Sequence, residues 1–173
     1  MDFQLSKEHE MARSLFKDFA EKEVKPLAIE VDDTHEFPRE TVSKMQKLGF
    51  MGIPIPKEYG GQGCDPLTYV MCVEELAKVC GTTSVIVSAH TSLCCDPIMT
   101  FGTEEQKQKY LIPLAQGKLL GAFGLTEPGA GTDAQGVQTK AVLSEDGKEW
   151  ILNGSKCFIT NGKEADIYII IAY

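Results

Sequence analysis

The sequence predicts an α+β multidomain chain, in which an all-α N-terminal helical bundle over residues 1–118 precedes the first antiparallel strands of an incomplete β domain over residues 119–173. Apolar residues recur at helical spacing through the first two thirds of the chain, and Pro and Gly mark the ends of these segments. After Lys118 the pattern changes to short runs of Ile, Val, Phe, Tyr and Trp separated by Asp-Gly and Asn-Gly pairs, which is typical of hairpins.

The first expected helix covers residues 6–29, despite the late Pro26. Its apolar residues recur on one face and predict an amphipathic helix; they are Met11, Leu15, Phe16, Phe19, Ala20 and Val24. A second helix is expected to begin at Pro38 and to stop at Gly49, because Pro suits the first turn of a helix and Gly the position just past its end.

The remaining helices are predicted from their capping residues. Asp65 is the expected N-cap of a helix that stops at Gly81. The next segment, "TTSVIVSAHTSLCC", is apolar and β-branched, but its length and small residues favour a buried helix. Thr103 and Gln106 have the spacing of a capping box for a last helix that ends near Gly117.

The C-terminal third is expected to form antiparallel hairpins. Its turn signals are Asp146-Gly147, Asn153-Gly154 and Asn161-Gly162. The chain ends within the apolar run Ile167–Tyr173. Because an open apolar strand edge favours aggregation, we expect either that the rest of the β domain lies beyond this chain or that another chain completes it.

Composition limits the function classes. The 173 residues are 43% hydrophobic and 24% charged, with a net charge of -8, as in a globular protein. The acidic balance argues against a nucleic-acid surface, and no apolar run reaches the roughly 20 residues of a membrane helix. The start resembles no signal peptide, which predicts a cytoplasmic protein. The six cysteines and three histidines lack metal-ligand spacing, so we expect reduced thiols and no metal site.

The stretch "AFGLTEPGAGTDAQG" is the candidate binding loop. Gly124 and Gly129 have P-loop spacing, but the required Lys is absent. Gly129, Gly131 and Ala134 fit a dinucleotide fingerprint, but hairpin sequence follows where that motif needs a helix, which disfavours an NAD-binding enzyme. From the local pattern alone, a glycine-rich crossover between domains remains open.

The string "FGLTEPGAGTD", followed by "NGSKCFITNG", resembles the acyl-CoA dehydrogenase family, flavoenzymes that oxidise acyl-CoA thioesters to 2-enoyl-CoA. The stretches "EKEVKP", "PKEYGG", "VEELAK" and "FGTEEQK" resemble family segments in family order, closest to the short-chain, butyryl-CoA branch. The resemblance implies an N-terminal helical domain and the start of a middle β-barrel domain. It also implies FAD as cofactor, a homotetramer, and electron-transferring flavoprotein as partner.

The resemblance assigns residues to the flavin. Phe123 begins the segment that lines the ring, and Leu125 and Thr126 offer backbone and hydroxyl hydrogen bonds to its polar edge. In "CFITNG", the aromatic Phe158 matches a residue that packs on the ring, and the hydroxyl of Thr160 matches one near flavin N5. Between these two lies Ile159, also assigned to the cofactor. The hydroxyl of Thr132 matches a Ser that contacts the CoA part of the substrate. The glycines are expected to allow close backbone approach and dihedral angles closed to other residues.

The resemblance implies α-proton abstraction by a glutamate with hydride transfer from the β-carbon to flavin N5. That glutamate belongs to a C-terminal domain of the family, so this chain is expected to carry no catalytic residue and to be inactive alone. Glu127 is expected to be a structural or solvated carboxylate. Residues 88–97 are expected to close the acyl pocket or, equally, to serve tight helix packing. The alternative function is a truncated, non-catalytic helical interaction fragment.

Overall fold

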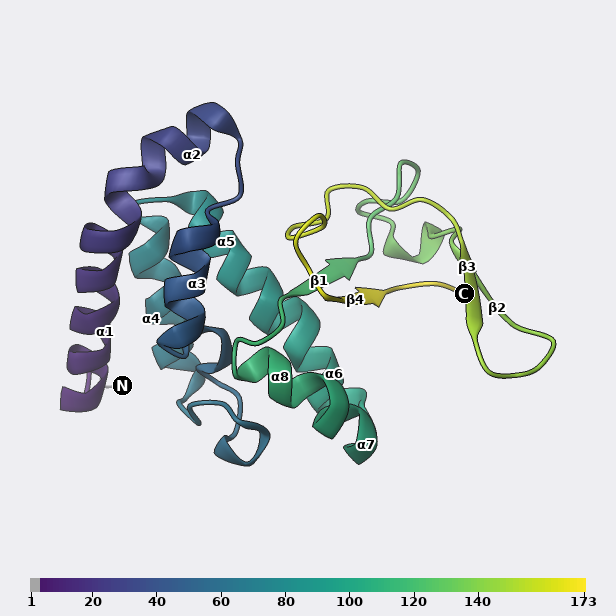
Figure 1. The fold of residues 1–173 in the computed structure, drawn as a ribbon, viewed down its shortest axis with the longest axis horizontal. Coiled ribbons are helices and arrows are strands. Elements are labelled where there is room, and N and C mark those ends of the chain that lie inside the picture. Colours follow the sequence, from purple (N-terminus) through teal and green to yellow (C-terminus); the bar gives the residue numbers. More distant parts are fainter. Residues whose placement is uncertain (1–3) are drawn as a thin grey trace.

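The helices gather at one end of the molecule and the strands at the other, in the computed structural model of the chain (Figure 1), which describes residues 4–173. The helices are α1 (Lys7–Phe19), α2 (Ala28–Thr34), α3 (Arg39–Lys47), α4 (Pro66–Ala77), α5 (Gly81–Ser88), α6 (Asp96–Phe101), α7 (Glu104–Gln106) and α8 (Ile112–Ala115). The strands are β1 (Gly121–Gly124), β2 (Lys140–Leu143), β3 (Trp150–Asn153) and β4 (Ile167–Ile170). The predicted order of a helical part followed by strands is confirmed.

Wide helical turns join the helices into longer rods. The π-helical segments are Ala20–Val24 after α1, Ala89–Cys95 between α5 and α6, and Lys107–Leu111 between α7 and α8. Each ends two residues before a proline, namely Pro26, Pro97 and Pro113. A proline ring clashes with the carbonyl one turn earlier, so widening the preceding turn lets the helix direction continue through it. The first helical rod therefore extends past the expected end at residue 29 to Thr34.

Capping explains where the helices begin. The side chain of Asp65 accepts from the Thr68 N–H, and Thr103 forms the expected capping box with Gln106. The expected stop at Gly81 is wrong, because α4 ends at Ala77 and Gly81 is the first residue of α5. The backbone N–H groups of Lys78, Val79 and Cys80 close the end of α4 onto its last carbonyls, so the helix ends without a left-handed glycine.

The strands form two separate pairs within residues 4–173. β2 and β3 are antiparallel and turn at Gly147, whose φ of 70° is left-handed, as the Asp146-Gly147 signal predicts. β1 and β4 are parallel, with Gly121 opposite Ile167, so the prediction of antiparallel strands is wrong for this pair. The Asn153-Gly154 and Asn161-Gly162 turns do not join adjacent antiparallel strands, because irregular chain after β3 crosses over to place β4 beside β1.

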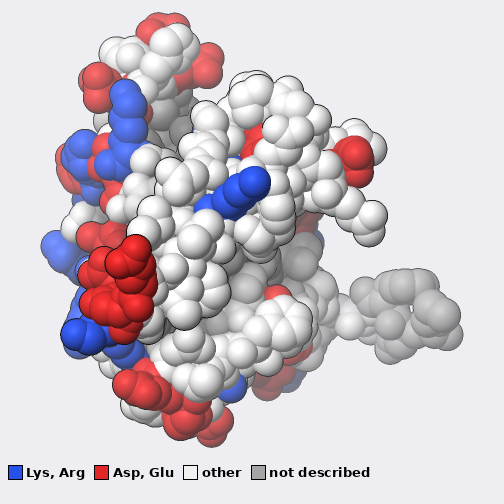
Figure 2. Space-filling model, turned by 90° about the vertical axis from the view of Figure 1, so that its right-hand side faces the viewer, with Lys and Arg blue, Asp and Glu red and all other residues white. Residues whose placement is uncertain are grey.

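Charged residues are unevenly placed. The molecule seen from its strand end shows acidic and basic side chains gathered along one side, while the middle of the view is mostly uncharged (Figure 2). The β2–β3 ribbon exposes Val142, Trp150, Ile151 and Leu152, each at least half accessible to solvent. No helix in residues 4–173 is long and apolar enough to cross a membrane.

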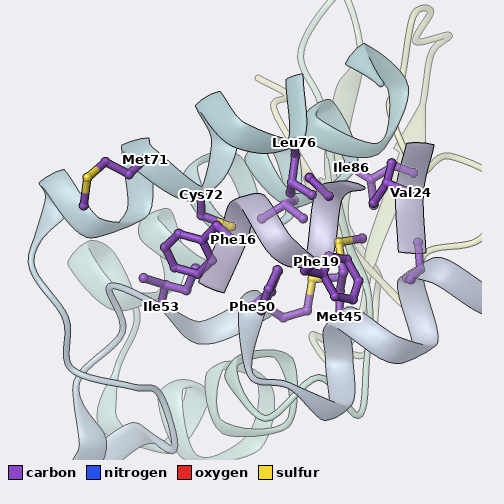
Figure 3. Packing of buried hydrophobic residues seen from close by; sticks show 14 of the residues in the cluster. Phe16, Phe19, Val24, Met45, Phe50, Ile53, Met71, Cys72, Leu76 and Ile86 are labelled. Carbon is purple, nitrogen blue, oxygen red and sulfur yellow. The ribbon is translucent and has the colours of Figure 1, made fainter. Parts of the chain in front are cut away.

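The main core lies among α1, α3, α4 and α5 (Figure 3). Phe16 meets Phe50 edge-to-face, with ring centroids 5.3 Å apart, and Met45, Cys72 and Leu76 are fully buried beside them. Two residues expected on the apolar face of α1 are instead exposed: Met11 at 73% and Leu15 at 55%. The neighbouring helices cover only the part of the apolar face of α1 that carries Phe16 and Phe19.

A histidine joins the helices to the strands. His90, in the π-helical turn after α5, is completely buried, and its Nδ1 accepts the N–H of Gly121 at 3.0 Å. Burial lowers the pKa of His90 to about 4, so the ring is neutral near pH 7. A Cβ on Gly121 would lie 2.5 Å from Cys94 Sγ, so β1 approaches this helix closely because residue 121 is glycine.

Candidate functional site

Two chain segments predicted to line a ligand lie side by side beyond β1. The N–H of Cys157 donates to the Thr126 carbonyl at 2.9 Å, and Lys156 Nζ donates to the Leu125 carbonyl at 2.8 Å. We call residues 125–126 the first edge and residues 158–160 the second edge. The fold thus places next to each other two segments that lie about thirty residues apart in the sequence.

The first edge presents donors to its surroundings. The carbonyls of Leu125 and Thr126 are both hydrogen-bonded, as described above. Among residues 4–173, by contrast, the backbone N–H groups of Leu125 and Thr126 and the Thr126 hydroxyl have no hydrogen-bond partner. Both residues are half-buried. Polar groups in such a position favour a ligand that carries acceptor atoms.

The second edge exposes a large aromatic residue. Phe158 is 93% accessible to solvent and has a φ of 57°, in the left-handed region that bulky side chains rarely adopt. A residue held in this region costs about 1–3 kcal/mol and persists where its surroundings fix it. Ile159 and Thr160 follow, both half-buried, and the Thr160 hydroxyl has no hydrogen-bond partner within residues 4–173. The edge therefore combines an apolar ring with an available hydroxyl.

Asn161 fixes the end of the second edge. It is buried, has a φ of 66°, and its Nδ2 donates to the Gly121 carbonyl at 3.0 Å and to the Ile86 carbonyl at 3.3 Å. These two carbonyls belong to β1 and α5, so one side chain ties the edge to both parts of the fold. The Asn161 Oδ1 is buried and has no partner among the described residues.

Glu127 lies directly after the first edge and is buried at 8% exposure. Its carboxylate accepts from Lys156 Nζ at 2.7 Å, from the Thr139 hydroxyl at 2.5 Å and from the N–H groups of Gln138 and Thr139. These bonds, that of Lys156 first, lower the pKa of Glu127 to about 2. So weak a base is unsuited to proton abstraction near pH 7, and of the two roles expected for Glu127, the structural one fits this geometry.

The glycines of the loop border open space. A Cβ added at Gly129 or Gly131 would meet nothing within 4 Å, and neither residue has a positive φ. The expectation that unusual dihedral angles require glycine is therefore wrong at these two positions. Gly129 and Gly136 line a hollow of about 350 Å³ beside Glu127, and Thr132 is exposed in the same loop. Gly129 and Gly136 therefore leave room for a ligand in the hollow beside Glu127.

The predicted residues separate into three groups. Leu125 and Thr126 accept hydrogen bonds from Lys156 and Cys157, and Phe158, Ile159 and Thr160 follow these two residues directly in the chain. Phe123 lies in β1, half-buried, and Thr132 lies in the loop that follows the first edge. The fold also reveals Lys156, Thr139 and Asn161, which sequence reasoning missed. Lys156 and Asn161 were within the quoted motif, whereas nothing in the pattern marked Thr139.

Residues 88–97 pack against β1 through their buried members. His90, Thr91, Cys94 and Cys95 are buried, while Ser92 and Leu93 face solvent. The Thr91 hydroxyl is buried without a partner among the described residues. The buried side of this segment serves helix packing, and its exposed side remains available to a ligand or another part of a larger protein.

Comparisons with known proteins agree on one family. The model of the acyl-CoA dehydrogenase N-terminal domain matches residues 6–118, and that of the middle domain matches residues 122–173. A short-chain specific acyl-CoA dehydrogenase of Clostridium acetobutylicum is 59% identical over 172 residues, which cover 99% of this chain and 45% of the relative. The chain thus spans about half the length of the curated relatives it matches.

Solved structures give the same result. A chain from a structure of the electron transferring flavoprotein of Acidaminococcus fermentans has a TM-score of 0.94 and 54% identity, with 99% of this chain and 45% of that chain covered. The structure of butyryl-CoA dehydrogenase of Megasphaera elsdenii has a TM-score of 0.93 and 47% identity, with 99% of this chain and 45% of that chain covered. An acyl-CoA dehydrogenase of Bacillus anthracis complexed with FAD has a TM-score of 0.92 and 39% identity, with 98% of this chain and 29% of that chain covered.

Proposed function

Because the chain belongs to the acyl-CoA dehydrogenase family, we propose that it supplies part of the flavin site and part of the substrate site of an enzyme that oxidises a short-chain acyl-CoA to the 2-enoyl-CoA. The observation that carries the proposal is the pairing of the two edges, one with free donors and the other with an exposed aromatic ring. Support for the short-chain substrate comes from the description of the Clostridium acetobutylicum relative.

FAD is the cofactor of this family, and the residues present fit it. A flavin ring has acceptor atoms along one edge and large apolar faces. The N–H groups of Leu125 and Thr126 and the Thr126 hydroxyl would hold the acceptor edge, while the ring of Phe158 would contact an apolar face. Beside Phe158, Ile159 and the Thr160 hydroxyl complete the second edge. When bound between these residues, FAD would supply the hydride acceptor for the β-carbon of the substrate.

This chain's own residues orient the reactants. Phe123 lies in β1 and Leu125 follows the strand directly, and with the ring bound the two edges would exclude water from the side of the ring that they cover. Thr132 would hold the CoA part of the substrate through its free hydroxyl, and residues 88–97 would close one side of the acyl pocket. Glu127 is held as a hydrogen-bonded carboxylate and is a poor base near pH 7. We propose that the catalytic base comes from a part of the enzyme outside this chain and that the chain alone is inactive.

The proposal extends to organisation and partners. We place the boundary between the helical domain, residues 1–118, and the first part of the β domain, residues 119–173, where Gly117 ends the last helix in a left-handed conformation. As in the family, the complete enzyme would be a homotetramer that passes electrons to an electron-transferring flavoprotein, and we propose that it is cytoplasmic.

A chimera tests the function. This chain replaces the matching segment of the Clostridium acetobutylicum relative, whose remaining half supplies the regions that the chain lacks. We expect the purified chimera to be yellow with FAD and to lose its visible absorbance when butyryl-CoA is added without oxygen. The 173-residue chain alone should leave butyryl-CoA unchanged. A folded chimera that stays colourless with added FAD would contradict the proposal and favour the alternative, a helical interaction fragment.

A further inference from the structure

One ion pair in residues 4–173 has both side chains buried, and it lies against the two edges. Lys156 and Glu127 are 9% and 7% exposed at their side chains, with Nζ and Oε1 2.7 Å apart. Every other described ion pair has at least one partner that is 20% or more exposed. Burying two charges is unfavourable unless further hydrogen bonds satisfy them, so a pair in this place calls for a specific role.

The hydrogen bonds of this pair connect three segments. Lys156 precedes the second edge, and its Nζ reaches across to the Leu125 carbonyl of the first edge at 2.8 Å. Glu127 follows the first edge, and its carboxylate accepts a hydrogen bond from the same ammonium group of Lys156. The other donors to Glu127 are the N–H of Gln138 and both the N–H and the hydroxyl of Thr139, next to β2. One carboxylate therefore anchors the lysine that spans the two edges.

The lysine also decides which polar groups the first edge offers. With Nζ on the Leu125 carbonyl and the Cys157 N–H on the Thr126 carbonyl, both acceptors of this edge are occupied. The N–H groups of the same two residues remain free. Without Lys156, the Leu125 carbonyl would be a free acceptor beside those donors and would repel the acceptor atoms of a flavin.

We propose that Lys156 and Glu127 are positioning residues for the flavin, fixing the spacing of the two edges and occupying the Leu125 carbonyl so that the backbone of the first edge offers only donors. The inference rests on the proposed function, because it takes the ligand of these edges to be FAD. Lys156 acts through the Leu125 carbonyl, and Glu127 acts through Lys156. Neither residue is a catalytic residue.

The test uses FAD affinity and the visible circular dichroism of bound flavin in the chimera. K156M should weaken FAD binding about 10- to 100-fold, the range for misplaced or unsupported site groups, and should change the flavin dichroism even at saturating FAD. K156R, which keeps a charged donor, should retain most of the affinity. E127Q should weaken binding less than K156M. The double variant should be no worse than K156M, because the two residues act as one unit.

E75Q is the matched control. Glu75 is as buried as Glu127, and its carboxylate bonds to Arg13 and Lys78 within the helical bundle, away from the edges. This variant should be less stable but should bind FAD with unchanged affinity and dichroism. If E75Q weakens binding as much as K156M, or if K156M leaves affinity and dichroism unchanged, the proposal is overturned.

Two further results keep the outcomes distinct. A parent chimera that binds no FAD refutes the proposed function, whatever the variants do. If K156M does not fold, as judged by far-ultraviolet circular dichroism, E127Q decides. Altered flavin dichroism in folded E127Q supports the positioning role, and an affinity and dichroism identical to those of the parent overturn it.

Discussion

Several residues at the junction of helices and strands act through single side chains with more than one partner. Asn161 bonds to carbonyls of α5 and β1, His90 bonds to the first N–H of β1, and Glu127 collects four donors. Asn161 and Glu127 adjoin the two edges in the chain, and His90 contacts the first residue of β1. The geometry of the candidate site therefore depends on polar contacts as well as on the apolar core.

Asn161 provides a residue-scale prediction. N161A removes the two hydrogen bonds that Asn161 donates to the Ile86 and Gly121 carbonyls, and places alanine at a φ of 66°. We expect the free energy of unfolding of the 173-residue chain to fall by about 3 kcal/mol. The free energy of unfolding should fall less in N161G than in N161A, because glycine adopts a left-handed conformation without steric cost.

Urea unfolding followed by circular dichroism measures both Asn161 variants. If N161A and N161G lose the same free energy, the left-handed conformation contributes nothing to the difference. If neither is destabilised, the two hydrogen bonds of Asn161 do not support this junction.

At the scale of elements, β1 contacts the helices as well as pairing with β4. The π-helical turn that carries His90 packs against β1, and the close approach of Gly121 to Cys94 leaves no room for a side chain there. The start of β1 is thus fixed by a helix, while the first edge, which follows β1, is fixed by Lys156 and Cys157.

The neutral His90 predicts a pH dependence of this contact. Its pKa is about 4 in the folded chain and 6.5 as the ordinary value, so the unfolded chain binds the proton more readily between these values. Stability should therefore fall as pH falls from 7 toward 4. Between pH 7 and pH 5 we expect a loss of about 2 kcal/mol from His90.

Urea unfolding of the 173-residue chain at pH 7 and pH 5, compared with H90Q, measures this loss. The other titratable side chains contribute to both proteins, so the difference between the two slopes isolates His90. The thiols of Cys94 and Cys95, whose pKa values are raised by burial, stay neutral over this range. An equal pH dependence in both proteins would contradict a buried neutral imidazole.

Much of the element order follows from local sequence, whereas the pairing of distant segments does not. The caps at Asp65 and Thr103 and the turn at Gly147 follow from local chemistry, and the structure has all three. The parallel pairing of β1 with β4 depends on contacts between residues far apart in the chain, so the Asn161-Gly162 pair predicted a hairpin instead. The roles of the predicted flavin residues came from family resemblance, while Lys156 and Thr139 emerge only from the fold.

At the scale of the whole molecule, the strand end has the character of an internal surface. Its face in Figure 2 is largely uncharged despite a net charge of -8, and the β2–β3 ribbon exposes apolar residues. A two-stranded ribbon is marginally stable by itself. These features fit the proposal that the described chain meets further polypeptide, as its coverage of 45% of the Clostridium acetobutylicum relative suggests.

The central claim is that the two edges form two sides of one flavin site. A crystal structure of the chimera with FAD tests this most directly. We expect the isoalloxazine ring between the edges, its acceptor edge on the N–H groups of Leu125 and Thr126 and one face on Phe158, with Lys156 still on the Leu125 carbonyl. A ring bound elsewhere, with the two edges empty, would contradict the account.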